Sequence, residues 1–100
     1  MFKFLRVTGR SLEPEYKEGD YVLVSKIPFF FRRARPGDVV AFRKPPYGLL
    51  IKQVEYLTPA GELFVLGTHA ASVDSLQFGP IPRQTVLGKV IAHVKKPRQE

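Results

Sequence analysis

Short apolar runs, each bounded by glycine, proline or aspartate, follow one another along almost the whole chain. Runs of this length with turn residues at both ends are typical of β-strands. No segment repeats its apolar residues with the 3.6-residue period of a long helix. The pattern therefore predicts a mainly β fold with little helix, in one domain covering residues 1–100.

The predicted strands are residues 2–8, 21–26, the end of 36–43, 49–57, 62–66 and 86–94. In the first of them, Phe2, Phe4 and Val7 are expected to point inward. The turn sequence at 58–61 predicts a hairpin between its neighbouring strands.

The remaining segments are predicted to be short or irregular. Residues 11–16 can form one helical turn, and residues 67–82 are rich in small polar side chains. Gly19-Asp20 and Gly37-Asp38 each precede a strand, so both are predicted to be turns that lead into buried strands. Residues 95–100 form a basic tail that is expected to be disordered.

Residues 27–36 place three phenylalanines and three arginines between two prolines. One interpretation is a loop whose rings cover one end of the core while the arginines are solvated. Another is a membrane or partner patch, in which rings enter a bilayer interface and arginines bind anionic headgroups. A nucleic-acid site would need the same residues and ranks lower. The residues concerned are Phe29, Phe30, Phe31, Arg32 and Arg33.

The charge balance leaves several partners open. The chain has 16 Lys and Arg against 9 Asp and Glu, a formal charge of +7, and is 44% hydrophobic, as expected for a globular protein. A basic surface can meet nucleic acid, acidic protein or anionic lipid. No apolar run is long enough to span a bilayer, and the first residues do not resemble a signal peptide. The expected location is therefore cytoplasmic or peripheral at the membrane.

Most catalytic groups are missing from the sequence. The absence of cysteine excludes a thiol nucleophile and a thiolate metal site. A Ser-His-Asp triad would need His69 or His93. His93 lies in a predicted strand and is expected to be structural, whereas His69 stays possible without a motif that requires it. Two histidines are weak support for a metal, and no cofactor is expected.

Ser11 and Lys52 offer a different chemistry. Ser11 lies in a predicted tight turn, with Gly9 before it and Pro14 after it, which suits an exposed nucleophile. Lys52 is a single cation in the apolar run 49–54. If it points inward, burial would lower its pKa from about 10.4 and allow the amine to accept a proton. An edge-strand lysine that points to solvent fits the local pattern equally well.

Five motifs in order resemble the type I signal peptidases, whose catalytic domain also occurs in LexA-like self-cleaving repressors. They are residues 9–14, 19–26, 35–42, 50–54 and 72–82, followed by Gly88-Lys89-Val90. The resemblance implies a compact, coiled antiparallel β-sheet domain. It is closest to the short, anchorless branch, which includes the nickel superoxide dismutase maturation peptidases.

The resemblance also implies roles for individual residues. Ser11 matches the nucleophile and Lys52 the general base, and Leu12 and Pro14 match positions beside the substrate. The supporting and oxyanion positions are Ser72, Asp74, Ser75 and Gly9. The implied reaction is removal of a leader or propeptide from a partner protein, through an acyl-enzyme on Ser11. The substrate would bind as an extended strand, with small residues next to the scissile bond.

The sequence departs from the family pattern at several positions. Leu12 replaces the usual methionine, Thr68 and His69 fall where Gly-Asp-Asn is common, and Leu76 replaces an arginine expected to pair with Asp74. Because of these changes, a second interpretation stays open: the protein is a catalytically weakened relative of the family that acts as an extended-peptide-binding module. A nucleic-acid-binding β-barrel is a third possibility, based on the charge and the Phe29–Arg35 segment.

Overall fold

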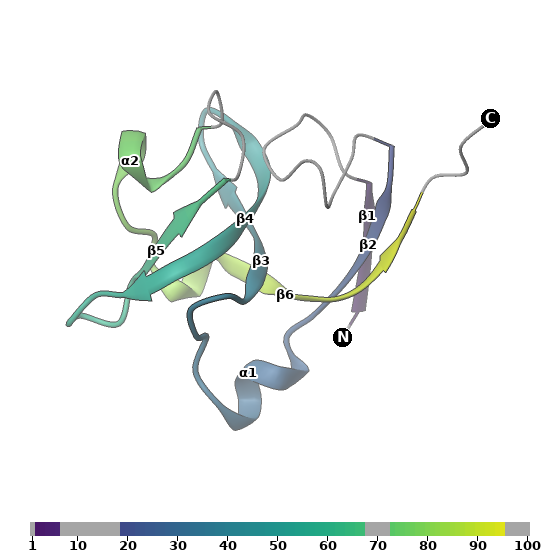
Figure 1. Ribbon diagram of the computed structural model, residues 1–100, viewed down its shortest axis with the longest axis horizontal. Coiled ribbons are helices and arrows are strands. Elements are labelled where there is room, and N and C mark those ends of the chain that lie inside the picture. The colour runs from purple at the N-terminus through teal and green to yellow at the C-terminus, as the bar shows by residue number, and fades with distance from the viewer. Residues whose placement is uncertain (1, 7–18, 68–72, 96–100) are drawn as a thin grey trace.

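Figure 1 shows the computed structural model of the chain, which describes residues 2–6, 19–67 and 73–95. Within them, six strands form one sheet in the order β1-β2-β6-β3-β4-β5, and all its pairings are antiparallel. The elements are β1 (Phe2–Arg6), β2 (Tyr21–Ser25), α1 (Ile27–Phe31), β3 (Val39–Lys44), β4 (Gly48–Leu57), β5 (Leu63–Leu66), α2 (Ser75–Phe78), a 3₁₀ turn (Arg83–Thr85) and β6 (Val86–Val94). The predicted mainly β fold is confirmed.

The last strand joins the two halves of the sheet. β6 pairs with β2 along its C-terminal part and with β3 along its N-terminal part, and both pairings contain a register shift. Gly88 lies at this crossing. A Cβ there would stand 2.7 Å from the backbone carbon and oxygen of Ser25 and 2.8 Å from Cγ1 of Val24. Only glycine therefore lets β6 approach β2 this closely.

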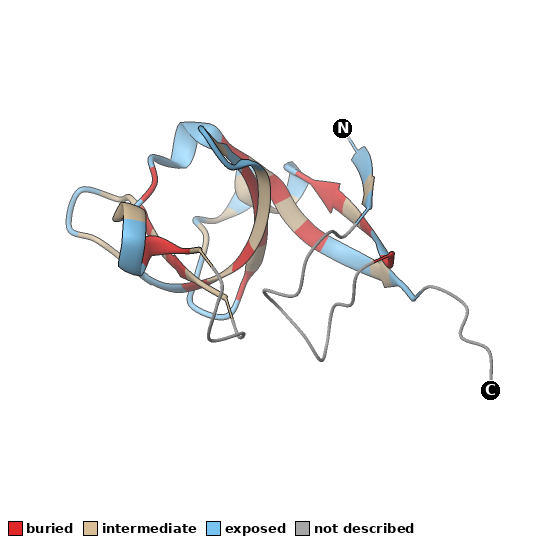
Figure 2. Cartoon of the chain, turned by 90° about the horizontal axis from the view of Figure 1, so that it is seen from above, coloured by how far each residue is buried: buried red, intermediate tan, exposed pale blue. Residues whose placement is uncertain are grey.

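The sheet buries residues on both of its faces. One cluster contains Val40, Phe42, Val54, Leu63, Val65, Ile81 and Val86, and the other contains Val22, Val24, Ala41 and Val90. Consecutive residues of β3 alternate between the two clusters, as the two-residue period of a strand requires. In Figure 2 the buried stretches lie mainly along the strands.

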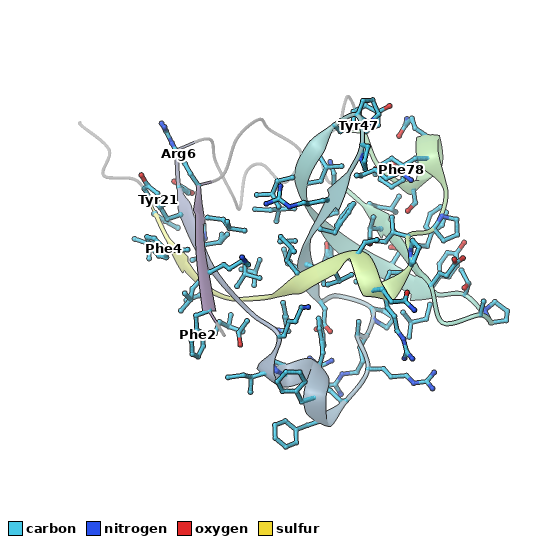
Figure 3. All side chains as sticks on the ribbon, turned by 180° about the vertical axis from the view of Figure 1, so that it is seen from behind. Phe2, Phe4, Arg6, Tyr21, Tyr47 and Phe78 are labelled. Carbon is cyan, nitrogen blue, oxygen red and sulfur yellow. The ribbon has the colours of Figure 1, made fainter. Side chains whose placement is uncertain are left out.

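The expectation that Phe2 and Phe4 point inward is wrong. Their exposed fractions are 57% and 58%, and Leu5, on the opposite face of β1, packs against the second cluster instead. The Phe4 ring stacks on Tyr21 with centroids 5.1 Å apart, and Figure 3 shows both rings on the β1–β2 ribbon. The alternation of apolar residues along β1 predicted the two-residue period correctly but assigned the phenylalanines to the wrong face of the strand. Val7 lies outside the described residues.

The aromatic–arginine segment contains a short helix, α1, rather than only a loop. Pro28 occupies its first turn, where a missing N–H costs nothing. Phe29 packs against the first cluster, as the core-covering interpretation expected. Phe30 and Phe31 do not, because their side chains are exposed.

Both predicted Gly-Asp turns lead into strands, and each buries its aspartate. Gly19 and Gly37 adopt φ values of 92° and 95°, which glycine reaches without strain. The Asp20 carboxylate accepts a hydrogen bond from Nε2 of His93 at 2.7 Å, so this histidine has a buried partner, as a structural histidine would. Asp38 pairs with Arg32. The two turns thus share a backbone conformation and differ in the side chain that contacts the carboxylate, which is His93 in one and Arg32 in the other.

Candidate active site

Lys52 is a buried lysine in the middle of β4. It lies directly opposite Val40 in the β3–β4 pairing, and paired residues of an antiparallel sheet share a face. Leu50 and Val54, two residues away on either side, lie on this face as well; Val54 belongs to the first cluster and Leu50 packs against it. The exposed fraction of Lys52 is 2%. The inward orientation is therefore confirmed, and the solvent-facing alternative is wrong.

The surroundings of Lys52 change its acidity. Burial lowers the pKa of the ammonium below its usual value, because a low-dielectric environment disfavours the charged form. The negative charge of Asp74 opposes this effect and raises the pKa, but to a smaller extent. The net result is an amine that deprotonates more readily than a free lysine. Such a group can serve as a general base.

Asp74 is fixed by backbone N–H groups. It caps α2, and its carboxylate accepts hydrogen bonds from the N–H of Leu76 at 3.0 Å and of Gly67 at 3.0 Å. Its own N–H donates to Oε1 of Gln77 at 2.9 Å, which completes a capping box. These bonds hold the carboxylate although Leu76 stands where the family resemblance expects an arginine. Sequence reasoning missed Gln77, although an acidic or hydroxyl residue followed three places later by glutamine is a recognisable signal.

Ser75 closes the free edge of the sheet. β5 is an edge strand, and its outward N–H groups would otherwise lack partners in the ladder. The N–H of Val65 donates to Oγ of Ser75 at 2.8 Å, and Leu63 forms a two-way backbone bridge with Ile81. Together with the hydrogen bond from the Gly67 N–H to Asp74, these contacts give acceptors to the outward N–H groups of this edge. Ser75 therefore holds the loop that carries Asp74 against β5.

Aromatic packing fixes the other side of α2. Phe78 meets Phe42 at 6.2 Å in an edge-to-face arrangement and Tyr47 at 6.2 Å, and Nζ of Lys44 lies 5.4 Å from its ring centre. Figure 3 shows Tyr47 and Phe78 side by side. The helix that Asp74 caps is thus held through both its capping box and its last residue. This rigidity suits a residue that tunes a neighbouring charge.

Several predicted site residues lie outside the described residues. They are Gly9, Ser11, Leu12, Pro14, Thr68, His69 and Ser72. The described residues bring Lys52, Asp74 and Ser75 to one end of the β4–β5 pair. They place the patch from Phe29 to Arg33 at a different end, around α1, as Figure 1 shows.

Among residues 2–6, 19–67 and 73–95, no group of three or more His, Cys, Asp and Glu side chains could hold a metal ion. No helix in this part of the chain combines the length and the apolar character that crossing a membrane requires.

Known proteins resemble the chain over most of its length. The family described as signal peptidase, peptidase S26, matches residues 1–57 and 51–94. Thylakoidal processing peptidase 1, chloroplastic, from Arabidopsis thaliana is 30% identical over 68 residues, which are 68% of this chain and 19% of that protein. The chain thus spans less than a fifth of the length of this curated relative. The family match includes the Lys52 strand and the Asp74 loop, and on this evidence the chain belongs to the signal peptidase family, peptidase S26.

Proposed function

We propose that the protein is a serine endopeptidase that removes a leader or propeptide from a partner protein, with Ser11 as nucleophile and Lys52 as general base. The observation that carries this proposal is the burial of Lys52, whose pKa is lowered by desolvation, in a chain of the signal peptidase family. Burying a lysine costs free energy because its charged form loses hydration, and ionisable groups perturbed in this way cluster at functional sites. Family membership supports a signal-peptidase-like protease role for the protein.

The reaction proceeds in two acyl-transfer steps. Neutral Nζ of Lys52 takes the proton from Oγ of Ser11, and Oγ attacks the peptide carbonyl carbon. N–H groups near Gly9 and Ser11 stabilise the oxyanion. The tetrahedral intermediate collapses, and the Lys52 ammonium gives its proton to the leaving amine. Water, deprotonated by Lys52, then cleaves the ester and restores Ser11.

The surrounding residues position the base. Ser72 orients the amine of Lys52 through its hydroxyl group. Asp74 adjusts the pKa of that amine through its charge, and Ser75 holds the loop in place. Both are positioning residues, because they act through Lys52 and not on the substrate.

The substrate is an extended peptide that runs past Leu12 and Pro14, with small residues such as alanine at the scissile bond. The name of the Arabidopsis relative, a processing peptidase, agrees with the removal of a segment from a larger protein. We place the reaction in the cytoplasm or at a membrane surface.

The test is cleavage of a panel of extended, alanine-containing peptides by wild type, Ser11→Ala and Lys52→Met. Wild type should cleave after small residues, and each variant should lose at least about a hundredfold in kcat/KM. Lys95→Met removes an exposed lysine and serves as the matched control, which should cleave like wild type. Thermal unfolding confirms that all four proteins are folded. A folded wild type that binds but does not cleave these peptides would indicate a peptide-binding relative instead.

A further inference from the structure

The tip of α1 presents two large apolar rings to solvent. The exposed fractions of Phe30 and Phe31 are 63% and 85%, and Ile27 at the start of the helix is also exposed. Their neighbour Phe29 packs against the core and holds the helix to the sheet. In Figure 1, α1 projects below the sheet, whereas α2 lies at its upper left. Water contact of two adjacent phenyl groups is unfavourable, which points to a partner that covers them.

The segment that carries these rings is firmly anchored. Both guanidinium nitrogens of Arg32 bond to the Asp38 carboxylate, at 2.9 and 3.2 Å, and the N–H of Arg35 donates to the same group at 2.9 Å. The Arg32 guanidinium also lies 5.9 Å from the centre of the Phe29 ring. Asp38 in turn is tied to β4 by the bond from the Val54 N–H to its carbonyl oxygen at 2.8 Å. The backbone that carries the exposed rings is therefore held in place and needs little ordering on binding.

Positive charge surrounds the rings. Lys26, Arg33 and Arg35 are exposed, and none of them forms an ion pair with a carboxylate of the described residues. Arg33 and Arg83 both line a depression of about 320 Å³ beside α1, whose floor includes Leu57 and Leu63. The carboxylate of Glu62 borders the neighbouring depression, which the same two arginines also line. The net sign of this end of the molecule is positive.

We propose that the α1 tip docks on an anionic lipid bilayer, with Phe30 and Phe31 inserted at the acyl boundary and Arg33, Arg35 and Lys26 against headgroup phosphates. Apolar rings next to exposed basic groups match the two layers of a membrane interface, the apolar acyl chains and the anionic headgroups. A five-residue helix offers far less than the ~800 Å² that each partner of a stable protein complex buries. A deformable bilayer needs no shaped surface opposite these rings.

Docking at α1 leaves the Lys52 end of the sheet free. Leu57, at the depression beside α1, and Lys52 are five residues apart on β4, which corresponds to about 17 Å of strand. The bilayer would thus orient the domain without covering the buried lysine. This inference does not depend on the peptidase proposal, because its readout is lipid binding.

The test is cosedimentation of the whole chain with vesicles of phosphatidylcholine containing about a third phosphatidylglycerol, compared with pure phosphatidylcholine, at about 0.1 M salt. Wild type should pellet with the anionic vesicles and stay soluble with the neutral ones. Phe30→Ser/Phe31→Ser should weaken binding about tenfold or more. Arg33→Gln and Arg35→Gln should each weaken it about fivefold.

The matched control is Tyr47→Ser/Leu76→Ser, which removes two large exposed side chains at α2, at the other end of the sheet from α1. It should bind anionic vesicles like wild type. Failure of wild type to pellet overturns the proposal. Unchanged binding of the Phe30/Phe31 variant also overturns it, because the attraction would then come from net charge alone. An equal loss of binding in the control variant overturns it as well. Unfolding curves of each variant establish that the fold is retained.

Discussion

Lys52 faces Val40 across the β3–β4 pair, so that an ammonium-bearing side chain occupies a position in the apolar cluster of the sheet. Antiparallel pairing fixes this position, since a slip by one residue would turn Lys52 to the opposite face. The location lowers the pKa of the amine. It also reduces the free energy of unfolding, because the charged form of the amine loses its hydration in the folded state. The same residue should therefore affect stability and activity in opposite directions.

Lys52→Met should stabilise the protein and abolish cleavage. Methionine fills a similar volume without a charge, so the free energy of unfolding at pH 7 should rise by about 1 kcal/mol or more. Urea denaturation measures this change, and peptide cleavage measures the loss of activity. Lys95→Met, an exposed substitution, should change neither. A less stable Lys52→Met protein would contradict the assigned cost of burial.

The pH dependence of stability supplies a second signature of the same group. The folded pKa of Lys52 lies below its unfolded value of about 10.4, so between the two the unfolded chain binds more protons. The free energy of unfolding of wild type should therefore rise with pH across that window. Lys52→Met should lack this rise. Parallel curves for the two proteins in alkaline solution would show that Lys52 titrates normally.

Asp74→Asn should shift the pH profile of cleavage. The Asp74 charge raises the pKa of Lys52, so its removal should lower that pKa further and move the rising limb of kcat/KM to lower pH. Asparagine is also a good N-cap, so α2 should persist. Leu76→Asn, an exposed change in the same helix, is the control and should leave the profile in place. If the rising limb of kcat/KM against pH stayed in place in Asp74→Asn, the charge of Asp74 would have no effect on the pKa of Lys52.

Ser75→Ala should loosen the β5 edge. The N–H of Val65 would lose its acceptor in a buried position, which costs about 1–3 kcal/mol. Hydrogen exchange of the Val65 amide should become faster, while exchange in β2 stays slow. Leu76→Ala changes an exposed neighbour and should have little effect on either. Unchanged protection of Val65 would mean that another group accepts this bond.

Acid should weaken the α1 anchor through Asp38. Burial by itself raises the pKa of this carboxyl, but the Arg32 hydrogen bond, the Arg35 N–H and the charges of Arg32 and Lys89 outweigh it and hold the pKa below its usual value. The stabilisation is therefore complete above the unfolded pKa of about 3.9 and is lost as pH falls through the folded pKa. Asp38→Asn should flatten the acid limb of a plot of unfolding free energy against pH. An identical acid limb would show that other carboxyls control it.

The sequence predicted the periodic parts of the fold well. The strand expected at 86–94 is observed as Val86–Val94, and the one expected at 49–57 as Gly48–Leu57, because long apolar runs with turn residues at their ends fix both type and length. The same alternation allowed, but could not decide, the inward direction of Lys52. That choice depends on which strands pair with β4, and pairing is a long-range property.

Other features depend on contacts that no local pattern encodes. Phe2 and Phe4 face solvent because Leu5 fills the available space in the second cluster. Gly88 is required by the close approach of Ser25, more than sixty residues earlier in the sequence. Of the candidate site, Lys52 and Asp74 lie close enough for the charge of Asp74 to act on the amine, whereas Ser11 and Ser72 lie outside the described residues. The catalytic and supporting roles of all these residues stay predictions.

The most direct test of the account compares the titration of the Lys52 amine with the pH dependence of cleavage. Nuclear magnetic resonance of the labelled lysine side chain gives the titration of Lys52 in the free protein. The pH dependence of kcat/KM gives the pKa values of the essential groups of the free enzyme. The account predicts that both share one midpoint, well below the value of about 10.4 for free lysine. The account would be contradicted if Lys52 titrated near 10.4 while kcat/KM had already reached its maximum at neutral pH.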